Sequence, residues 1–359
     1  MKPTQELHDL GQSLWVDNIT RDMLDEGTLE GYIDELSVTG LTSNPTIFDK
    51  AISAGDDYDE QINELREGGL ETEDLFFELA ITDLRRAADL FKEVHAGSDT
   101  MDGFVSLEVS PLLANETDPT VKQASELHGK ADRENLFIKI PGTEAGLPAI
   151  EESIYAGIPI NVTLLFDRDQ YLAAAEAYMR GIGRRIDDGL DPDVRSVASL
   201  FISRWDVAVA DQVPAELKNR LGIAIGKATY KAYRELLDSA RWQKLESEGA
   251  RPQRLLWAST GTKDPDASDT LYIEAFAAPN TINTMPDKTL RAFADHGKVG
   301  EPMAADGGDA SEVLAAFADA GVNVDELAAR LQVEGADAFS KSWHDMLDSI
   351  SHEAEKLAS

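Results

Sequence analysis

The sequence has no cysteine and few histidines. The absence of cysteine from 359 residues excludes disulfides, cysteine nucleophiles and zinc sites built from thiolates. It is also compatible with a cytoplasmic protein. The six histidines all lie in stretches that we predict to be helices or loops. We therefore expect neither a metal site nor acid–base chemistry based on histidine.

Long apolar runs and positive charge are also scarce. No run of about 18 apolar residues occurs, so no membrane span is predicted, and residues 1–8 lack the apolar core of a signal peptide. The formal net charge is −34. Such a charge repels nucleic acid and anionic lipid. We expect a well-solvated acidic surface, with adaptation to high salt as an alternative. A phosphorylated substrate would need a local pocket of positive charge.

Short apolar runs alternate with longer amphipathic stretches along most of the chain. Strands are predicted at Leu14–Ile19, Val38–Ser43, Phe104–Val109, Leu136–Ile140, Ile160–Phe166, Val194–Ile202, Arg254–Ser259 and Thr281–Met285. Helical patterns between them include Thr72–Glu93, Asp169–Gly181, Ala215–Asp238 and Ser268–Ala277. Eight strand–helix units in succession predict the α/β class, as a closed (β/α)8 TIM barrel with extra helices.

The pattern after residue 286 is helical only. Its main runs are Asp309–Ala320 and Val324–Leu357. We expect residues 287–359 to form additional C-terminal helices packed on the barrel, rather than a cover over its mouth. Because no long linker interrupts the chain, we expect residues 1–359 to form a single domain.

One predicted strand has a lysine at its centre. Lys139 lies between two isoleucines in the run Leu136–Ile140, and Pro141 follows them. Burial of an ammonium group costs several kcal/mol unless the site compensates. A buried lysine that becomes neutral is a nucleophile able to form a Schiff base with a ketone. The alternative is a lysine that extends to the rim of the barrel.

Polar residues occur at or near the ends of seven predicted strands, which is where active sites of (β/α)8 barrels lie. They are Asp17, Thr42, Ser43, Asn44, Glu108, Ser110, Lys139, Asn161, Thr163, Ser199, Arg204, Ser259 and Lys263. Each has a structural alternative. Asp17 could cap the next helix, Asn44 could belong to a turn, and Glu108 could be a paired core carboxylate. Packing alone does not explain why seven strands share this costly choice.

Taken together, these residues suit imine chemistry. Lys139 would attack a ketone, and Glu108 would shuttle protons through a water molecule while the imine forms. The protonated imine withdraws electrons, so the adjacent carbon–carbon bond can break. Asp17 would take the proton from the hydroxyl whose carbon becomes the aldehyde. Arg204, Ser259 and Lys263 would hold a phosphate.

The same segments resemble the transaldolase family, specifically its longer bacterial branch. The matching segments are Leu14-Trp15-Val16-Asp17, Gly40-Leu41-Thr42-Ser43-Asn44-Pro45-Thr46-Ile47-Phe48, Val105-Ser106-Leu107-Glu108-Val109, Phe137-Ile138-Lys139-Ile140-Pro141, Ile160-Asn161-Val162-Thr163-Leu164-Leu165-Phe166, Val197-Ala198-Ser199-Leu200-Phe201-Ile202-Ser203-Arg204, Trp257-Ala258-Ser259-Thr260-Gly261-Thr262-Lys263 and Asn280-Thr281-Ile282-Asn283-Thr284-Met285-Pro286. The resemblance implies a class I aldolase-like barrel.

The resemblance also implies a role for each matching residue. Lys139 forms the imine, Asp17 is the acid–base carboxylate, and Glu108 works with a catalytic water held by Thr163. Asn44 and Asn161 bind hydroxyls of the dihydroxyacetone unit, with Ser199 beside them, and Arg204 and Ser259 bind phosphate. Shorter family members have an arginine where Gly261 stands, so Lys263 is the expected substitute here.

The implied reaction moves a dihydroxyacetone unit from sedoheptulose 7-phosphate to glyceraldehyde 3-phosphate, giving erythrose 4-phosphate and fructose 6-phosphate in the pentose phosphate pathway. No metal or organic cofactor is implied. The expected partners are sugar phosphates, without nucleic acid or membrane, and the expected assembly is a monomer or homodimer.

Three alternatives remain. Fructose 6-phosphate aldolase shares the lysine but tends to have glutamine in place of Glu108 and tyrosine in place of Phe201. A non-catalytic barrel that binds sugar phosphates would be expected to lack Lys139, Asp17 or Glu108. A barrel enzyme with another chemistry would use Lys139 only for structure.

Overall fold

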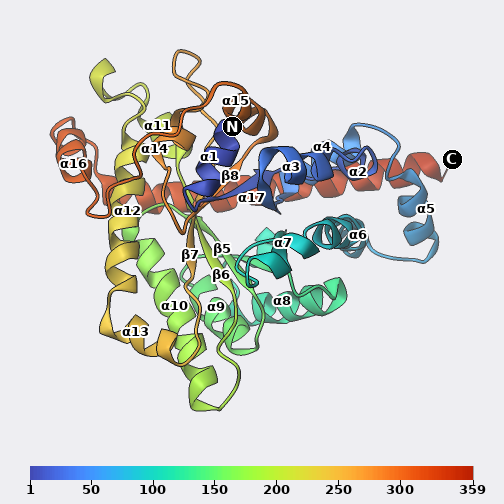
Figure 1. Ribbon diagram of the computed structural model, residues 1–359. Helices are drawn as coiled ribbons and strands as arrows, with labels where there is room; N and C mark the ends of the chain where they lie inside the picture. The colour runs from blue at the N-terminus through green and yellow to red at the C-terminus, as the bar shows by residue number, and fades with distance from the viewer. Residues whose placement is uncertain (359) are drawn as a thin grey trace.

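Eight parallel strands form the centre of this computed structural model, which describes residues 1–358 (Figure 1). They are β1 (Ser13–Asp17), β2 (Val38–Thr42), β3 (Val105–Glu108), β4 (Leu136–Pro141), β5 (Ile160–Leu165), β6 (Ser196–Phe201), β7 (Arg254–Ala258) and β8 (Ile282–Met285). All eight predicted strands are confirmed, each boundary within two residues. The strand order is β2-β1-β8-β7-β6-β5-β4-β3.

The sheet closes into a barrel where β2 meets β3. Gly40 on β2 bridges Phe104 in parallel, and the Leu41 N–H donates to the Phe104 carbonyl at 3.0 Å. A Cβ atom at residue 40 would lie 2.6 Å from the Trp15 ring and 2.7 Å from the Phe104 carbonyl oxygen. Glycine is therefore required for this close approach. The structure confirms the predicted (β/α)8 barrel.

Helices surround the barrel and extend from it (Figure 1). Within residues 1–358 the α-helices are α1 (Pro3–Asp9), α2 (Arg21–Asp25), α3 (Thr28–Leu36), α4 (Pro45–Ser53), α5 (Asp59–Glu67), α6 (Thr72–Leu90), α7 (Lys92–Gly97), α8 (Thr117–Ala131), α9 (Gly146–Tyr155), α10 (Arg168–Asp187), α11 (Ser203–Val209), α12 (Leu221–Leu237), α13 (Ala240–Ser247), α14 (Leu271–Ala275), α15 (Asp287–His296), α16 (Ala310–Asp319) and α17 (Val324–Leu357). The short 3₁₀ turns are η1 (Pro111–Leu113) and η2 (Ala215–Leu217). None of these helices is long and apolar enough to cross a membrane.

Some helix boundaries differ from the predicted ones. The helix predicted at Thr72–Glu93 ends at Leu90, and α7 follows. The helix predicted from residue 215 begins at Leu221 instead, because the buried Asp206 carboxylate accepts the N–H groups of Leu221 and Gly222 at 2.9 and 3.2 Å. A cap supplied from a distant part of the chain fixes that start, and it is not visible in the local pattern.

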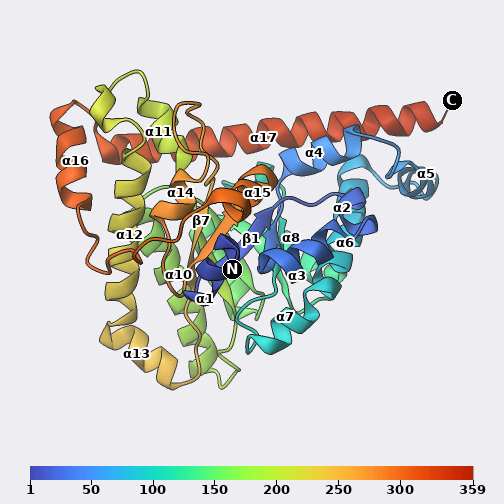
Figure 2. The ribbon, with the colours of Figure 1, turned by 45° about the horizontal axis from the view of Figure 1, so that its top comes forward.

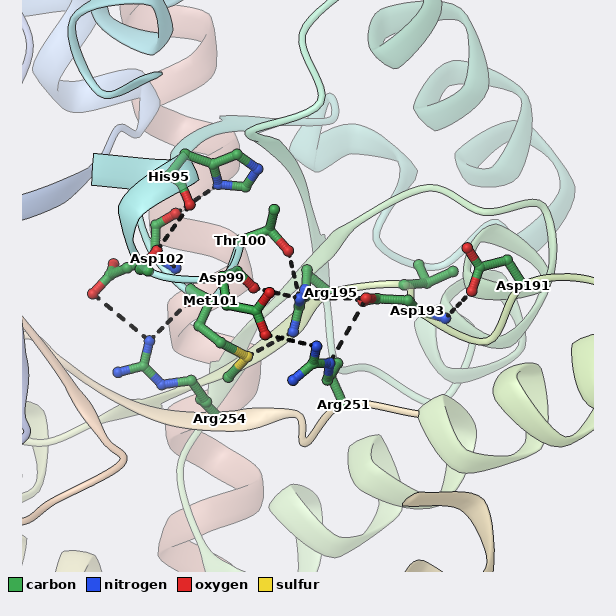
Figure 3. Close-up of polar contacts among 12 residues, drawn as sticks. His95, Asp99, Thr100, Met101, Asp102, Asp191, Asp193, Arg195, Arg251 and Arg254 are labelled. Carbon is green, nitrogen blue, oxygen red and sulfur yellow. Dashed lines mark hydrogen bonds and ion pairs between the residues drawn. The ribbon is translucent and has the colours of Figure 1, made fainter. Parts of the chain in front are cut away.

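A buried polar cluster closes the N-terminal end of the barrel (Figure 3). The Arg254 guanidinium donates to the Met101 carbonyl at 3.1 Å, to the Thr281 carbonyl at 3.1 Å and to the Ser13 hydroxyl. It also lies 3.9 Å from the Asp102 carboxylate. These residues lie at or a few residues before the starts of β1, β3, β7 and β8, so the cluster connects strands at the end opposite the predicted site.

The C-terminal helix α17 lies at the other end of the barrel. Figure 2 shows it as a long red helix that runs from the side of α16 to α5. The Gln332 side-chain amide donates to the carbonyls of Gly142 and Leu164 at 3.1 and 3.0 Å, beyond the end of β4 and within β5. This placement differs from the expectation that the C-terminal helices pack only on the outside of the barrel.

Candidate active site

A cavity of about 390 Å³ opens at the C-terminal ends of the strands. Most of the predicted site residues line it, namely Asp17, Asn44, Lys139, Thr163, Ser199, Arg204, Ser259 and Lys263. The two others, Glu108 and Asn161, lie just behind this lining and bond to residues in it. A neighbouring cavity of about 400 Å³ lies on the far side of Lys263 and shares only that residue with the predicted set.

Lys139 is held by an ion pair inside the barrel. The parallel register places Glu108 on β3 beside Lys139 on β4, and Lys139 beside Asn161 on β5. The Lys139 ammonium donates to the Glu108 carboxylate at 3.0 Å and to the Ser43 carbonyl at 3.0 Å. Both side chains are almost fully buried, with 7% and 6% exposed. Lys139 therefore does not extend to the rim, and its partner is a group able to accept its proton.

Asp17 lies on the β1 side of the same cavity. The Thr42 hydroxyl donates to its carboxylate at 2.7 Å, and the Thr42 and Thr284 hydroxyl oxygens lie 2.7 Å apart. Asp17 does not cap the next helix, because Thr20 accepts the Met23 N–H at the start of α2. The carboxylate is thus left available to a molecule in the cavity.

Burial changes the acidity of both carboxyl groups. It raises the pKa of Asp17 above its ordinary value, although the Thr42 hydrogen bond and the charges of Lys139 and Lys263 oppose the shift. Burial likewise raises the pKa of Glu108, with Lys139 opposing and Asp17 adding to the effect. A carboxylate with a raised pKa is a stronger base, which suits proton transfer near neutral pH.

Thr163 lines the cavity at an irregularity in β5. Leu164 has a positive φ of 58°, and the pairing of β5 with β6 shifts register between Val162 and Leu165. The Thr163 hydroxyl oxygen is buried and has no hydrogen-bond partner among the described residues. A buried hydroxyl of this kind is suited to holding a small polar molecule.

The two asparagines are used differently. The Asn44 side-chain oxygen accepts the Ile47 N–H at 3.1 Å and so begins α4, while the residue also lines the cavity. Asn161 is fully buried. Its amide donates to the Ser106 hydroxyl at 3.2 Å, and its oxygen accepts from the Ser199 hydroxyl at 2.7 Å. Ser199 rather than Asn161 forms the wall there.

Three positively charged side chains besides Lys139 line the cavity. Arg204, Lys263 and Lys50 line it, and none of the three makes an ion pair with a residue in the described part of the chain. Burial lowers the pKa of Arg204, and the Glu334 charge opposes this change. Ser259 has a positive φ of 56°, and its hydroxyl lies 2.8 Å from that of Ser203. In a chain with a net charge of −34, unpaired cations in a concave site favour an anionic ligand.

The described residues contain no cluster of metal-binding side chains. Across residues 1–358, no group of three or more His, Asp or Glu side chains is arranged to hold a metal ion. What the site does provide is an amine with a carboxylate behind it, a second carboxylate in the lining, hydroxyl and amide groups, and unpaired cations.

Comparison with known proteins identifies the family. The model of the Transaldolase/Fructose-6-phosphate aldolase family matches residues 14–350. The chain belongs to this family. A transaldolase of Frankia alni is 43% identical over 360 residues, which cover 98% of this chain and 97% of the relative. Transaldolases of Parafrankia sp. and Thermobifida fusca are each 42% identical, over 100% and 99% of this chain and 100% and 98% of the relatives. The resemblance to transaldolases seen in the strand-end motifs is thus confirmed.

Two cavity residues of this transaldolase-family chain lie outside the strand-end motifs and were not predicted. Lys50 lies in α4, and Phe339 lies in α17. Neither residue is near the end of a strand. The rule that active-site residues lie at the C-terminal ends of barrel strands therefore could not predict them. The one weak signal for Lys50 in the sequence is its place two residues after the motif that ends at Phe48. No local signal distinguishes Phe339 from other apolar residues of an amphipathic helix.

Proposed function

We infer that the protein is a transaldolase that forms a Schiff base at Lys139. It transfers a dihydroxyacetone unit from sedoheptulose 7-phosphate to glyceraldehyde 3-phosphate, and the products are erythrose 4-phosphate and fructose 6-phosphate. The observation that carries this inference is the buried pair of Lys139 and Glu108, 3.0 Å apart, in a cavity that also holds unpaired cations. The family and the names of the relatives support the same reaction.

In the first step Lys139 becomes neutral by passing its proton to Glu108. The raised pKa of Glu108 lowers the cost of this transfer. The amine then bonds to the ketone carbon of the donor, and the resulting carbinolamine loses its hydroxyl as water. Glu108 returns the proton needed for this loss, through a water molecule that the free Thr163 hydroxyl would hold.

In the second step the protonated imine accepts the electrons of the adjacent carbon–carbon bond. Asp17 takes the proton of the hydroxyl on the departing carbon, which becomes the aldehyde of erythrose 4-phosphate. A raised pKa makes Asp17 a suitable base for this step. The three-carbon enamine left on Lys139 attacks the aldehyde of the acceptor, Asp17 returns the proton, and hydrolysis of the new imine releases fructose 6-phosphate.

The remaining site residues would orient the sugar. Asn44 and Ser199 face the hydroxyls of the three-carbon unit, with Asn161 fixing the position of Ser199 through their 2.7 Å hydrogen bond. Arg204, Ser259 and Lys263 hold the phosphate, with Lys263 in place of an arginine at residue 261. Lys50 adds a further cation to the same cavity. No metal or organic cofactor is needed for any of these steps.

A fructose 6-phosphate aldolase is the second candidate, because the matched family includes that activity by name. Two residues favour transfer. Glu108 is a carboxylate that pairs with Lys139, where the aldolase tends to have glutamine. Phe201 lines the cavity, where the aldolase tends to have tyrosine.

The proposal also treats the chain as a single cytoplasmic domain, active as a monomer or homodimer. α17 supports the single domain, since it contributes Phe339 to the same cavity as the strands.

Borohydride reduction during turnover tests the Schiff base. Fructose 6-phosphate and borohydride should leave a reduced three-carbon adduct on Lys139, located by peptide mass spectrometry. The Lys139→Met variant should carry no adduct, and exposed lysines such as Lys122 should remain unmodified in both proteins. A folded, active wild-type protein with unmodified Lys139 would contradict the mechanism. Rapid release of dihydroxyacetone from fructose 6-phosphate without an acceptor would instead identify an aldolase.

A further inference from the structure

We propose that Phe339 of α17 is a positioning residue that shields the enamine on Lys139 from bulk water, so that the three-carbon unit is transferred rather than released. This inference rests on the proposed transaldolase function. The centroid of the Phe339 ring lies 5.8 Å from the Lys139 nitrogen. The ring lines the cavity and is 8% exposed. Phe339 thus brings an apolar ring of the C-terminal helix close to the reactive nitrogen.

Phe339 and Phe201 together form an apolar wall near the amine. Their rings lie 6.3 Å apart in an edge-to-face arrangement, which is a favourable geometry for aromatic pairs. The cationic imine is also favoured by a ring within about 6 Å. Neither ring carries a group that could deliver a proton to a carbon atom held at Lys139.

Contacts on both sides of Phe339 fix the helix in place. Gln332, Gly335, Phe339 and Ser342 follow a helical repeat and so share one face of α17. Gln332 bonds to the carbonyls of Gly142 and Leu164 two turns before Phe339. The Thr46 hydroxyl donates to the Ser342 hydroxyl at 2.8 Å one turn after it. A Cβ atom at residue 335 would lie only 3.0 Å from the Leu164 side chain, so glycine allows this close packing.

The chemistry of the enamine explains why shielding matters. Release of dihydroxyacetone requires a proton on the enamine carbon, after which water adds to the imine carbon and the carbon–nitrogen bond breaks. Transfer instead forms a bond from that same carbon to the aldehyde carbon of the acceptor. The two outcomes compete for one carbon atom. Exclusion of bulk water as a proton source therefore favours transfer without changing the imine-forming groups.

The test compares Phe339→Ala with Phe339→Leu and a matched control. Val333→Ala lies on the outer side of the same helix, where Val333 is 62% exposed. For each variant, dihydroxyacetone release from fructose 6-phosphate without an acceptor is measured against transfer from sedoheptulose 7-phosphate to glyceraldehyde 3-phosphate. Phe339→Ala should raise the ratio of release to transfer by about tenfold, because water then reaches the enamine carbon as a proton source. Phe339→Leu should give a smaller rise, and Val333→Ala none.

The ratio separates this role from a structural one. A variant that is merely less stable loses both activities together, and its melting temperature falls while the ratio stays constant. An unchanged ratio in folded Phe339→Ala would overturn the proposal, even if both rates decreased. If the wild-type protein forms no adduct on Lys139 and transfers nothing, the transaldolase function fails instead, which the wild-type assay alone would reveal.

Discussion

Replacement of Arg204 by alanine is expected to weaken the binding of phosphorylated sugars selectively. Arg204 lines the cavity and is partly buried, and it makes no ion pair with any described residue. Its guanidinium is therefore free to hold a phosphate. Loss of the side chain should raise the KM for fructose 6-phosphate but have little effect on the KM for unphosphorylated fructose.

The size of this effect follows from the position of the charge. At about 4 Å and an effective dielectric constant of about 20, two unit charges attract by about 4 kcal/mol. Desolvation of both groups reduces this, and hydrogen bonds to charged groups contribute about 1.5–3 kcal/mol net. Because Lys263 and Lys50 remain in the cavity, we expect a loss of about 2–3 kcal/mol. That corresponds to a KM about 30- to 150-fold higher.

Steady-state kinetics with both donors would measure this difference. The matched control is Lys218→Ala, which removes one positive charge outside this cavity, in the wall of the neighbouring one. Both variants make the net charge of −34 more negative by one unit, so a general field effect would appear equally in both. Equal KM changes for fructose 6-phosphate and fructose would show that Arg204 is not a phosphate ligand.

Four further predictions concern Asp17, the pH profile, the closed end of the barrel and the surface charge. Asp17→Asn should slow cleavage of fructose 6-phosphate by about 10²- to 10⁴-fold. Borohydride added with this donor should then trap an adduct on Lys139 that still has all six carbons, and a three-carbon adduct would contradict the assigned role. In the wild type, activity should be lost as the pH falls through the raised pKa of Asp17, so the acid limb of the kcat/KM profile should lie above the pKa of a free aspartate. Arg254→Met leaves the buried Asp102 carboxylate without its cation and should lower the free energy of unfolding by about 3–5 kcal/mol, measured with urea, with kcat unchanged in the folded protein. The melting temperature should rise between dilute and molar KCl because salt screens the repulsion within a chain of net charge −34, and a flat dependence would contradict this.

The position of the site could be predicted from the sequence because, in a barrel of parallel strands, the residues that follow successive strands lie at the same end. Parallel strands bring their C-terminal ends to one side, so Asp17, Lys139 and Arg204 could be grouped without a structure. Lys139 stood out because a charged residue in an apolar strand is costly. These inferences need only the period of the strands and the cost of burying charge, and both can be read locally.

The exact partners of those residues could not be predicted in this way. The ion pair between Lys139 and Glu108 depends on the register of β3 against β4, and a shift of one residue would turn the side chains to the opposite face. The inward bonding of Asn161 to Ser106 and Ser199 depends on the packing of three strands. Register and packing are properties of the closed barrel, not of any one segment.

The sequence by itself determined the barrel, the strand-end residues and the lysine buried in the fourth strand, since each follows from local periodicity and burial cost. Only the tertiary structure decided that α17 brings Phe339 to Lys139 and that α4 adds Lys50 to the cavity. An amphipathic helix shows that one of its faces is buried. It does not show which distant surface that face covers, because that choice depends on contacts made across hundreds of residues of chain.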